Sequence, residues 1–258
     1  MKTINKYFLM MLAGGMLLFT ACSDDIEREP SPVPTEGVQA YIYADKTTLA
    51  YLPDDEQSFN VKIGRQKTEE AASIHLSTDA EEVTLPATVD FAAGESVKEV
   101  KVTFDIPVGS TLSFDISIPE EEGYIYANNT ITVNITRDYT WQDIGTGIYT
   151  SSAFGQSWPQ AIQKAKEANV YKLLDCITEG YPMIFTLSDD NQSLVEWDIQ
   201  ATGYEEDGYG MTYFAAKDMK RNGNELVFTV QLLVSYNGGW GSFGDFTETL
   251  QFPEGFEL

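Results

Sequence analysis

Two glycine-rich segments late in the sequence carry the residues best suited to bind a ligand. The stretches 203–210 and 236–244 place tyrosine and tryptophan rings among short polar side chains. A flat ring stacks on the apolar face of a sugar while nearby carboxylates and amides bond its hydroxyls; exposed rings also anchor protein interfaces. The alternative is that Tyr209 and Trp240 fold back onto the end of the domain. We predict a glycan-binding or protein-binding site formed by Tyr204, Glu206, Asp207, Tyr209, Tyr236, Asn237 and Trp240.

Residues for nucleophilic or metal-assisted catalysis are sparse. His75 is the single histidine, and its alternation with Ile74 and Leu76 indicates a surface position on a strand. A lone histidine does not build the usual zinc sites, which draw on several His or Cys ligands. Cys176 precedes an isoleucine, which indicates a buried core thiol. We expect no catalytic nucleophile, no metal site and no cofactor.

Catalysis by a carboxylate pair, as in glycosidases, is harder to exclude, because it needs only two acidic side chains on either side of the bond to be cleaved. With 40 Asp and Glu residues in the chain, a chance pair is nearly certain. A small β domain also gives little room for a deep cleft. We therefore predict that the protein is not an enzyme, with a carboxylate-pair hydrolase as the less favoured alternative. Its candidate residues are Glu196, Asp198, Glu205, Glu206 and Asp207.

The charge balance narrows the classes of partner. The chain has 16 basic and 40 acidic residues and a net charge of −24. Nucleic-acid binding depends on neutralising phosphates, so this balance argues against a nucleic-acid partner, and it equally disfavours docking on anionic lipid. The excess of acids suits solubility, and calcium is compatible with it.

The N-terminus predicts export. Lys2 and Lys6 form a basic start, and an apolar run follows over residues 7–19. This run is shorter than the ~20 residues of a membrane span, so we interpret residues 1–21 as a signal peptide that is removed. Small residues before Cys22 resemble a bacterial lipobox, although Phe19 stands where an aliphatic residue is usual. The resemblance implies that Cys22 carries the acyl chains; the alternative is an ordinary signal peptide with a chance cysteine.

Residues 22–36 read as a tether. Ser23-Asp24-Asp25 with Glu27 and Glu29 resembles the surface-export signal of Bacteroidetes lipoproteins. That resemblance implies the outer membrane, facing the medium; a periplasm-facing protein with a solvated spacer is the alternative. Alternating prolines after Glu29 favour an extended spacer. The membrane would be contacted through the lipid anchor only.

Residues 37–137 predict an immunoglobulin-like β-sandwich, because short period-two runs alternate with turn residues. The sequence from Leu85 to Ser96, followed by the alternating runs Val100–Phe104 and Leu112–Ile116, resembles Calx-β-type modules, which are common in Bacteroidetes surface lipoproteins. Calcium-binding members carry clustered acids at their loop ends. Here the usual acidic closing strand is missing around Arg137, so we assign no calcium site.

Residues 138–258 predict a second antiparallel β domain, either a barrel or a sandwich. Its opening, Trp141 followed by Gly145-Thr146-Gly147-Ile148-Tyr149, resembles the all-β C-terminal domains of the same lipoproteins. Helix-forming residues in the stretch 157–169 also allow one short helix, with a strand as the alternative. With Cys22 acylated, Cys176 has no disulfide partner. The whole chain therefore predicts a non-catalytic surface lipoprotein that binds a glycan, or alternatively a structural or adhesion lipoprotein that contacts a surface protein.

Overall fold

The computed structural model describes Ser31 and residues 37–236 and 238–258. Within that part of the chain the structure is all-β, and its single helical turn is the 3-10 turn η2 (Glu120–Glu122). The all-β fold class is thus confirmed. The predicted signal peptide and Cys22 lie outside the described residues. No helix in the described part is long and apolar enough to cross a membrane.

The first β region is a sandwich of two four-stranded sheets with orders β1-β3-β8-β6 and β2-β10-β9-β5, and β4 pairs separately with β7. Neighbouring strands are antiparallel except β2 and β10, which are parallel. Both sheets contribute to one hydrophobic core. The strands are β1 (Ala40–Tyr43), β2 (Thr48–Tyr51), β3 (Ser58–Arg65), β4 (Ala72–His75), β5 (Ser77–Thr78), β6 (Val83–Thr84), β7 (Thr88–Phe91), β8 (Val97–Phe104), β9 (Ser110–Ser117) and β10 (Thr130–Arg137).

Alternating apolar residues explain why these segments form a sandwich. In β8 the side chains of Val100, Val102 and Phe104 are buried, and the residues between them are half-buried or exposed. Successive side chains of a strand point to opposite faces, so such a segment buries one face and leaves the other in water. The strands β7 and β10 follow the same pattern.

One buried cation lies within this sandwich. The Arg65 side chain is 3% exposed and donates hydrogen bonds to the carbonyl oxygens of Glu70, Ala92 and Glu95, each at 2.8 Å. Its guanidinium carbon also lies 5.1 Å from the centre of the Phe91 ring. These contacts tie two loops to the end of β3, because the rigid fork of an arginine fixes the direction of each bond.

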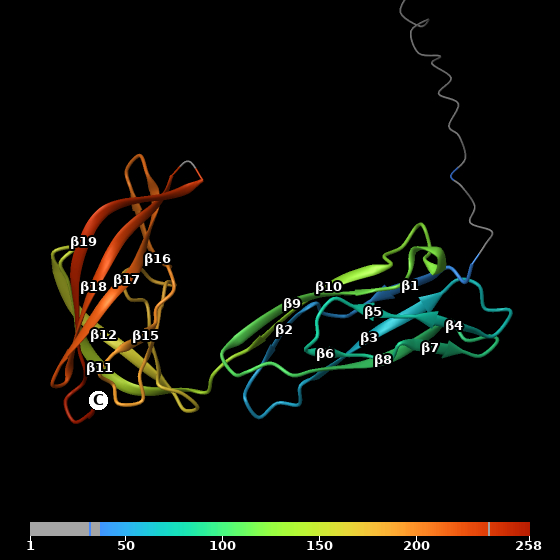
Figure 1. Ribbon diagram of the computed structural model, residues 1–258, viewed down its shortest axis with the longest axis horizontal. Coiled ribbons are helices and arrows are strands. Elements are labelled where there is room, and N and C mark those ends of the chain that lie inside the picture. Colours follow the sequence, from blue (N-terminus) through green and yellow to red (C-terminus); the bar gives the residue numbers. More distant parts are fainter. Residues whose placement is uncertain (1–30, 32–36, 237) are drawn as a thin grey trace, which may run out of the picture. The chain divides into compact units, whose positions relative to one another are not determined.

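The second β region is one sheet of nine antiparallel strands, as far as the structure describes it, in the order β15-β14-β13-β12-β11-β19-β18-β17-β16 (Figure 1). The strands are β11 (Trp141–Ser151), β12 (Gln156–Ala165), β13 (Val170–Leu173), β14 (Met183–Leu187), β15 (Leu194–Glu196), β16 (Gln200–Glu206), β17 (Gly210–Asn222), β18 (Glu225–Tyr236) and β19 (Gly239–Gln251).

A side chain connects the edge strand β16 to β14, which is next to the other edge of the sheet. The edge strands β15 and β16 are consecutive in sequence, so the sheet curls back on itself. The Gln200 amide accepts a hydrogen bond from the Ile184 backbone nitrogen and donates one to the Ile184 carbonyl oxygen, both at 2.7 Å. One side chain therefore takes the place of a ladder contact between β14 and β16.

Aromatic rings fill the interior of the curled sheet. Phe228 is fully buried, and its ring centre lies 5.2 Å from that of Phe185 and 5.0 Å from that of Trp197. Tyr171 stacks on Phe185, with ring centres 5.4 Å apart. Trp197 and Cys176 are 9% and 1% exposed, which confirms both as core residues.

The stretch 157–169 is mostly strand, and the helix alternative is wrong. Its residues 156–165 form β12, in which Gln160, Ile162 and Ala165 are buried. Pairing with β11 over the length of β12, and with β13 at Ile162–Lys164, outweighs the helix propensity of its alanines and lysines. Pro159 is tolerated because it precedes the stretch paired to β13.

Candidate functional site

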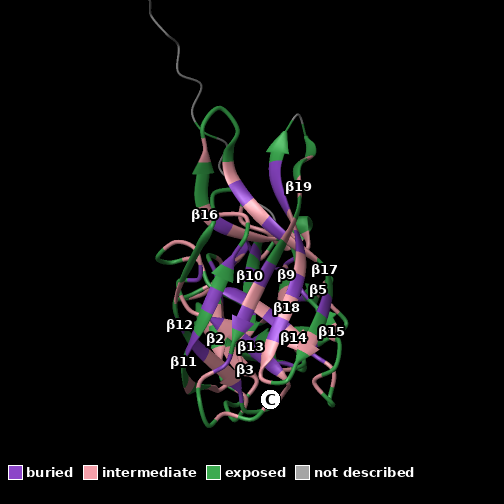
Figure 2. Cartoon of the chain, turned by 90° about the vertical axis from the view of Figure 1, so that its left-hand side faces the viewer, coloured by how far each residue is buried: buried purple, intermediate pink, exposed green. Residues whose placement is uncertain are grey.

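The two predicted ligand-binding segments are not free loops but the ends of long β-hairpins. Residues 203–210 comprise the end of β16, the turn and the first residue of β17, and residues 236–244 run from the last residue of β18 into β19. In the second β region, Figure 1 shows both hairpin ends on the side away from the C-terminus, and Figure 2 shows the end of β16 and the end of β18, where the chain turns into β19, as exposed. Gly238 has a backbone φ of 77°, which permits the turn between the strands.

The aromatic side chains at these hairpin ends are accessible to a ligand. The exposed fractions are 60% for Tyr236, 52% for Trp240, 52% for Tyr209 and 42% for Tyr204. The alternative in which Tyr209 and Trp240 fold back onto the domain is therefore not what the structure has. Asn237, also predicted for the site, lies outside the described residues.

Two of the exposed rings at the tips, Tyr209 and Trp240, have an aromatic partner that the sequence does not reveal. The Tyr209 ring meets Phe243 edge to face, with centres 5.4 Å apart and an angle of 85°. Trp240 meets Tyr213 in the same way at 5.0 Å and 74°. Edge-to-face pairs of this kind are worth about 0.5–1.5 kcal/mol each. We call these four rings the hairpin platform; the pairing holds each exposed ring in a defined orientation.

The strand register puts the Trp240–Tyr213 pair on the face of the sheet opposite the core. Tyr213 is directly across from Leu233, and Leu233 from Ser242. Directly opposed residues share a face, and so do residues two apart along a strand, which adds Trp240. Phe214, the next residue after Tyr213, is fully buried in the core. The pair therefore lies on the outward face.

Tyr204 lies in a different group. Its ring meets Phe154 edge to face at 5.2 Å and 75°, beside a groove of about 380 Å³. The carboxylate of Glu206 and, more weakly, that of Asp207 raise the pKa of the Tyr204 hydroxyl by their negative charge, with Glu206 also accepting a hydrogen bond. The structure thus brings Tyr204 and Glu206 together and puts Tyr209 and Trp240 in the hairpin platform. The groove is lined by Phe154, Gln156, Trp158, Asp175, Cys176, Ile177, Thr178 and Tyr204.

The histidine and the cysteine considered for catalysis each lie in a separate local environment. His75 ends β4 on the surface, as predicted, and its Nδ1 atom lies 2.5 Å from Glu122 Oε1. Burial raises the pKa of the Cys176 thiol, which disfavours the reactive thiolate. The residues that the structure describes contain no group of three or more His, Cys, Asp or Glu side chains arranged to hold a metal ion.

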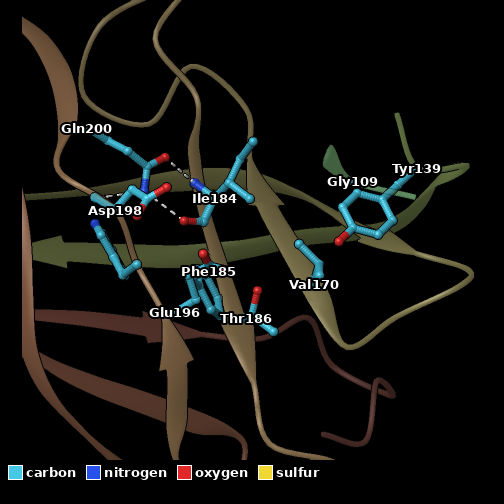
Figure 3. Close-up of a pocket in the computed structure, with 10 residues that line it drawn as sticks. Gly109, Tyr139, Val170, Ile184, Phe185, Thr186, Glu196, Asp198 and Gln200 are labelled. Carbon is cyan, nitrogen blue, oxygen red and sulfur yellow. Dashed lines mark hydrogen bonds between the residues drawn. The ribbon is translucent and has the colours of Figure 1, made fainter. Parts of the chain in front are cut away.

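Two of the acids weighed for a hydrolase line one small pocket. Glu196, Asp198 and Gln200 border a pocket of about 240 Å³, next to the Gln200–Ile184 hydrogen bonds (Figure 3). Burial raises the pKa of the Tyr139 hydroxyl at its rim, and the charge of Glu196 adds to the effect. Small-molecule sites usually enclose ~300–1,000 Å³, so this pocket falls below the usual size for a substrate cleft.

A buried carboxyl group lies inside the second β region. Glu248 on β19 is fully buried; its Oε1 accepts hydrogen bonds from Ser151 Oγ at 3.0 Å and the Ala153 nitrogen at 3.2 Å. Its Oε2 atom and the buried Tyr149 hydroxyl have no hydrogen-bond partner in the described part of the chain. Burial raises the pKa of Glu248, and the hydrogen bonds from Ser151 and Ala153 only partly oppose that shift.

Replacement of Glu248 by glutamine is expected to remove a pH-dependent loss of stability. A carboxyl whose folded pKa exceeds its unfolded pKa of ~4.3 contributes most below that value and loses its contribution as pH rises through the folded pKa. Wild type should therefore lose stability relative to Glu248→Gln on going from acid to neutral pH. Urea unfolding of both proteins across that range measures the difference, with the exposed Glu254→Gln as the charge-loss control. A difference that does not change with pH would contradict the assignment.

Comparisons with known proteins found only distant similarity to solved structures. No protein-family profile and no curated protein matches the chain. A solved protein of unknown function from Bacteroides ovatus is 9% identical with a TM-score of 0.41, over 83% of this chain and 90% of that chain. The calcium-binding domain CBD12 of CALX1.1 is 12% identical with a TM-score of 0.31, over 78% and 82%. An auxiliary nutrient binding protein from Bacteroides thetaiotaomicron is 12% identical with a TM-score of 0.31, over 80% and 90%. At these values the likenesses carry no argument about a ligand.

Proposed function

We propose that this chain is a non-catalytic binding lipoprotein of the outer membrane surface, and that its second β region contacts an extracellular glycan. The observation that carries the proposal is the hairpin platform. Its Tyr209 and Trp240 rings are exposed at the ends of two neighbouring hairpins and are held by the edge-to-face partners Phe243 and Tyr213. Apolar rings that gather on an exposed surface often mark an interaction site.

Charge supports a neutral partner over an anionic one. Removal of residues 1–21 takes away Lys2 and Lys6 but no acid, which changes the net charge from −24 to −26. Such a surface repels phosphate, sulfate and anionic lipid headgroups. A neutral sugar ring avoids this repulsion and presents an apolar face to the rings.

Binding is tested with the full chain, purified in detergent, on an array of neutral and acidic glycans. We expect retention by one or more neutral glycans and a clear loss of it in Trp240→Ala. The control is Tyr126→Ala, which removes an equally exposed ring from the first β region (52% exposed in both cases). Equal retention of wild type and Trp240→Ala would reject the platform as the site. If no glycan is retained, the role as a protein-contacting adhesion lipoprotein replaces this proposal.

Surface display depends on Cys22. We expect Cys22→Ala to abolish acylation and to release the protein from the membrane fraction, because the tether has no apolar segment to hold it there. Protease added to intact cells should degrade wild type. Mass spectrometry of the mature N-terminus measures the lipid directly. A mature chain that starts elsewhere, or one that external protease leaves intact, would contradict the surface location.

A further inference from the structure

A second site lies apart from the hairpin platform, in the groove beside Tyr204. We propose that this groove binds one short, neutral saccharide between the rings of Trp158, Phe154 and Tyr204. The inference rests on the proposed function only in assuming the same class of ligand, since it uses different residues. The groove has a volume of about 380 Å³, which is at the lower end of the ~300–1,000 Å³ that small-molecule sites enclose.

The ring walls of the groove are fixed before any ligand arrives. The Trp158 ring lies 5.2 Å from Tyr149, and its Nε1 donates a hydrogen bond to the buried Gln160 at 3.2 Å. The Phe154 ring packs 6.1 Å from the core residue Phe214 and 5.2 Å from Tyr204. Rings that are already ordered lose little entropy on binding, which favours affinity.

The loop that carries Asp175 and Thr178, two further lining residues, is also held in place. Gly203 has a φ of 78°, and a Cβ atom built there would lie 2.4 Å from Tyr181 and 2.6 Å from Thr178. Only glycine lets β16 pass this close to the loop before β14. That loop is tied by hydrogen bonds from the Gly180 nitrogen to Asp175 Oδ1 at 2.7 Å and from the Tyr181 nitrogen to the Thr178 carbonyl at 3.1 Å.

The chemistry of the lining selects a neutral polyhydroxylated ligand. No lysine, arginine or histidine lines the groove in the described part of the chain, so an anion has no counter-charge there. Asp175 supplies the one carboxylate, and its Oδ1 already accepts a backbone hydrogen bond. Gln156 and Thr178 add uncharged donors and acceptors for hydroxyl groups. The groove thus combines aromatic rings with uncharged polar groups, the two kinds of contact that a sugar ring uses.

The four tryptophans allow one experiment to locate the ligand. Trp158 lines the groove and Trp240 belongs to the hairpin platform, whereas Trp197 is in the core and Trp141 begins β11. The full chain is labelled with 5-fluorotryptophan, and each fluorine resonance is assigned with single Trp→Phe variants. It is then titrated with di- and trisaccharides of glucose, galactose, mannose and xylose, with glucuronate and choline as charged probes.

We expect the Trp158 resonance to shift with at least one neutral saccharide while that of Trp197 stays in place. Tyr204→Ala should weaken that binding about tenfold or more, Tyr204→Phe should retain it, and Tyr126→Ala should leave it unchanged. The groove proposal fails if Trp158 responds to no neutral saccharide, or only to glucuronate or choline. A shift of Trp240 alone would reject the groove and keep the platform, whereas movement of neither resonance would remove both.

Discussion

Phe228→Ala is expected to lower the free energy of unfolding of the second β region by about 3–5 kcal/mol, the usual range for a fully buried phenylalanine. Phe228 is fully buried against the stacked rings of Phe185 and Trp197, so truncation leaves a cavity and removes two edge-on ring contacts. Because a domain typically has only ~5–15 kcal/mol of stability, a loss of this size is large. Tryptophan fluorescence during urea unfolding reports on this region, since all four tryptophans lie between residues 141 and 240.

The matched control removes the same side chain from the surface. Phe243 is 42% exposed and touches Tyr209 at the hairpin platform. We expect Phe243→Ala to cost less than about 1 kcal/mol. If the two variants lost similar stability, the interior packing described for Phe228 would be wrong.

Arg65→Ala is expected to destabilise the first β region by roughly 4 kcal/mol or more. Hydrogen bonds to a charged group are worth ~1.5–3 kcal/mol each, and this buried guanidinium donates three to loop carbonyls. Far-UV circular dichroism during urea unfolding follows this region, which has no tryptophan. The two hydrophobic cores share no residue, so the fluorescence transition of the second region should move little.

Two further variants separate the geometry of Arg65 from its charge. Arg65→Lys retains the charge but cannot form the three-carbonyl fork, so we expect it to recover only part of the loss. Lys101→Ala breaks an ion pair with Glu56 in which both side chains are more than half exposed, and it should cost below about 1 kcal/mol. Full recovery in Arg65→Lys would show that the charge, and not the fork, holds the loops.

The strands and the core were largely predictable from the sequence, because burial follows the period of two. The alternation around Val100 and Val102 predicts β8 correctly. Trp197 is buried as predicted, but Val195 and Ile199, which the alternation put on the same inward face, are 64% and 44% exposed, because β15 ends at Glu196. The stretch 157–169 was ambiguous because its helix propensity is local, whereas the pairing that makes it β12 comes from strands on either side.

The candidate site was predictable only in part. The exposed rings in glycine-rich segments were recognisable from the sequence. Their contacts with Phe243 and Tyr213 depend on how the strands pair, which no local sequence pattern reveals. Tyr204 was assigned to the same site as Trp240, whereas the structure puts it with Phe154 beside the groove. The sequence gives no indication that Arg65 is buried, since a charged residue at the end of a strand is normally on the surface.

The most direct test of the account is a calorimetric titration of the best array glycan into wild type, Trp240→Ala and Tyr126→Ala. Truncation of an aromatic anchor typically costs about 2 kcal/mol, so the Kd of Trp240→Ala should rise about thirtyfold. Tyr126→Ala should bind as wild type does. Unchanged affinity in Trp240→Ala, or an equal loss in Tyr126→Ala, would contradict glycan binding by the hairpin platform.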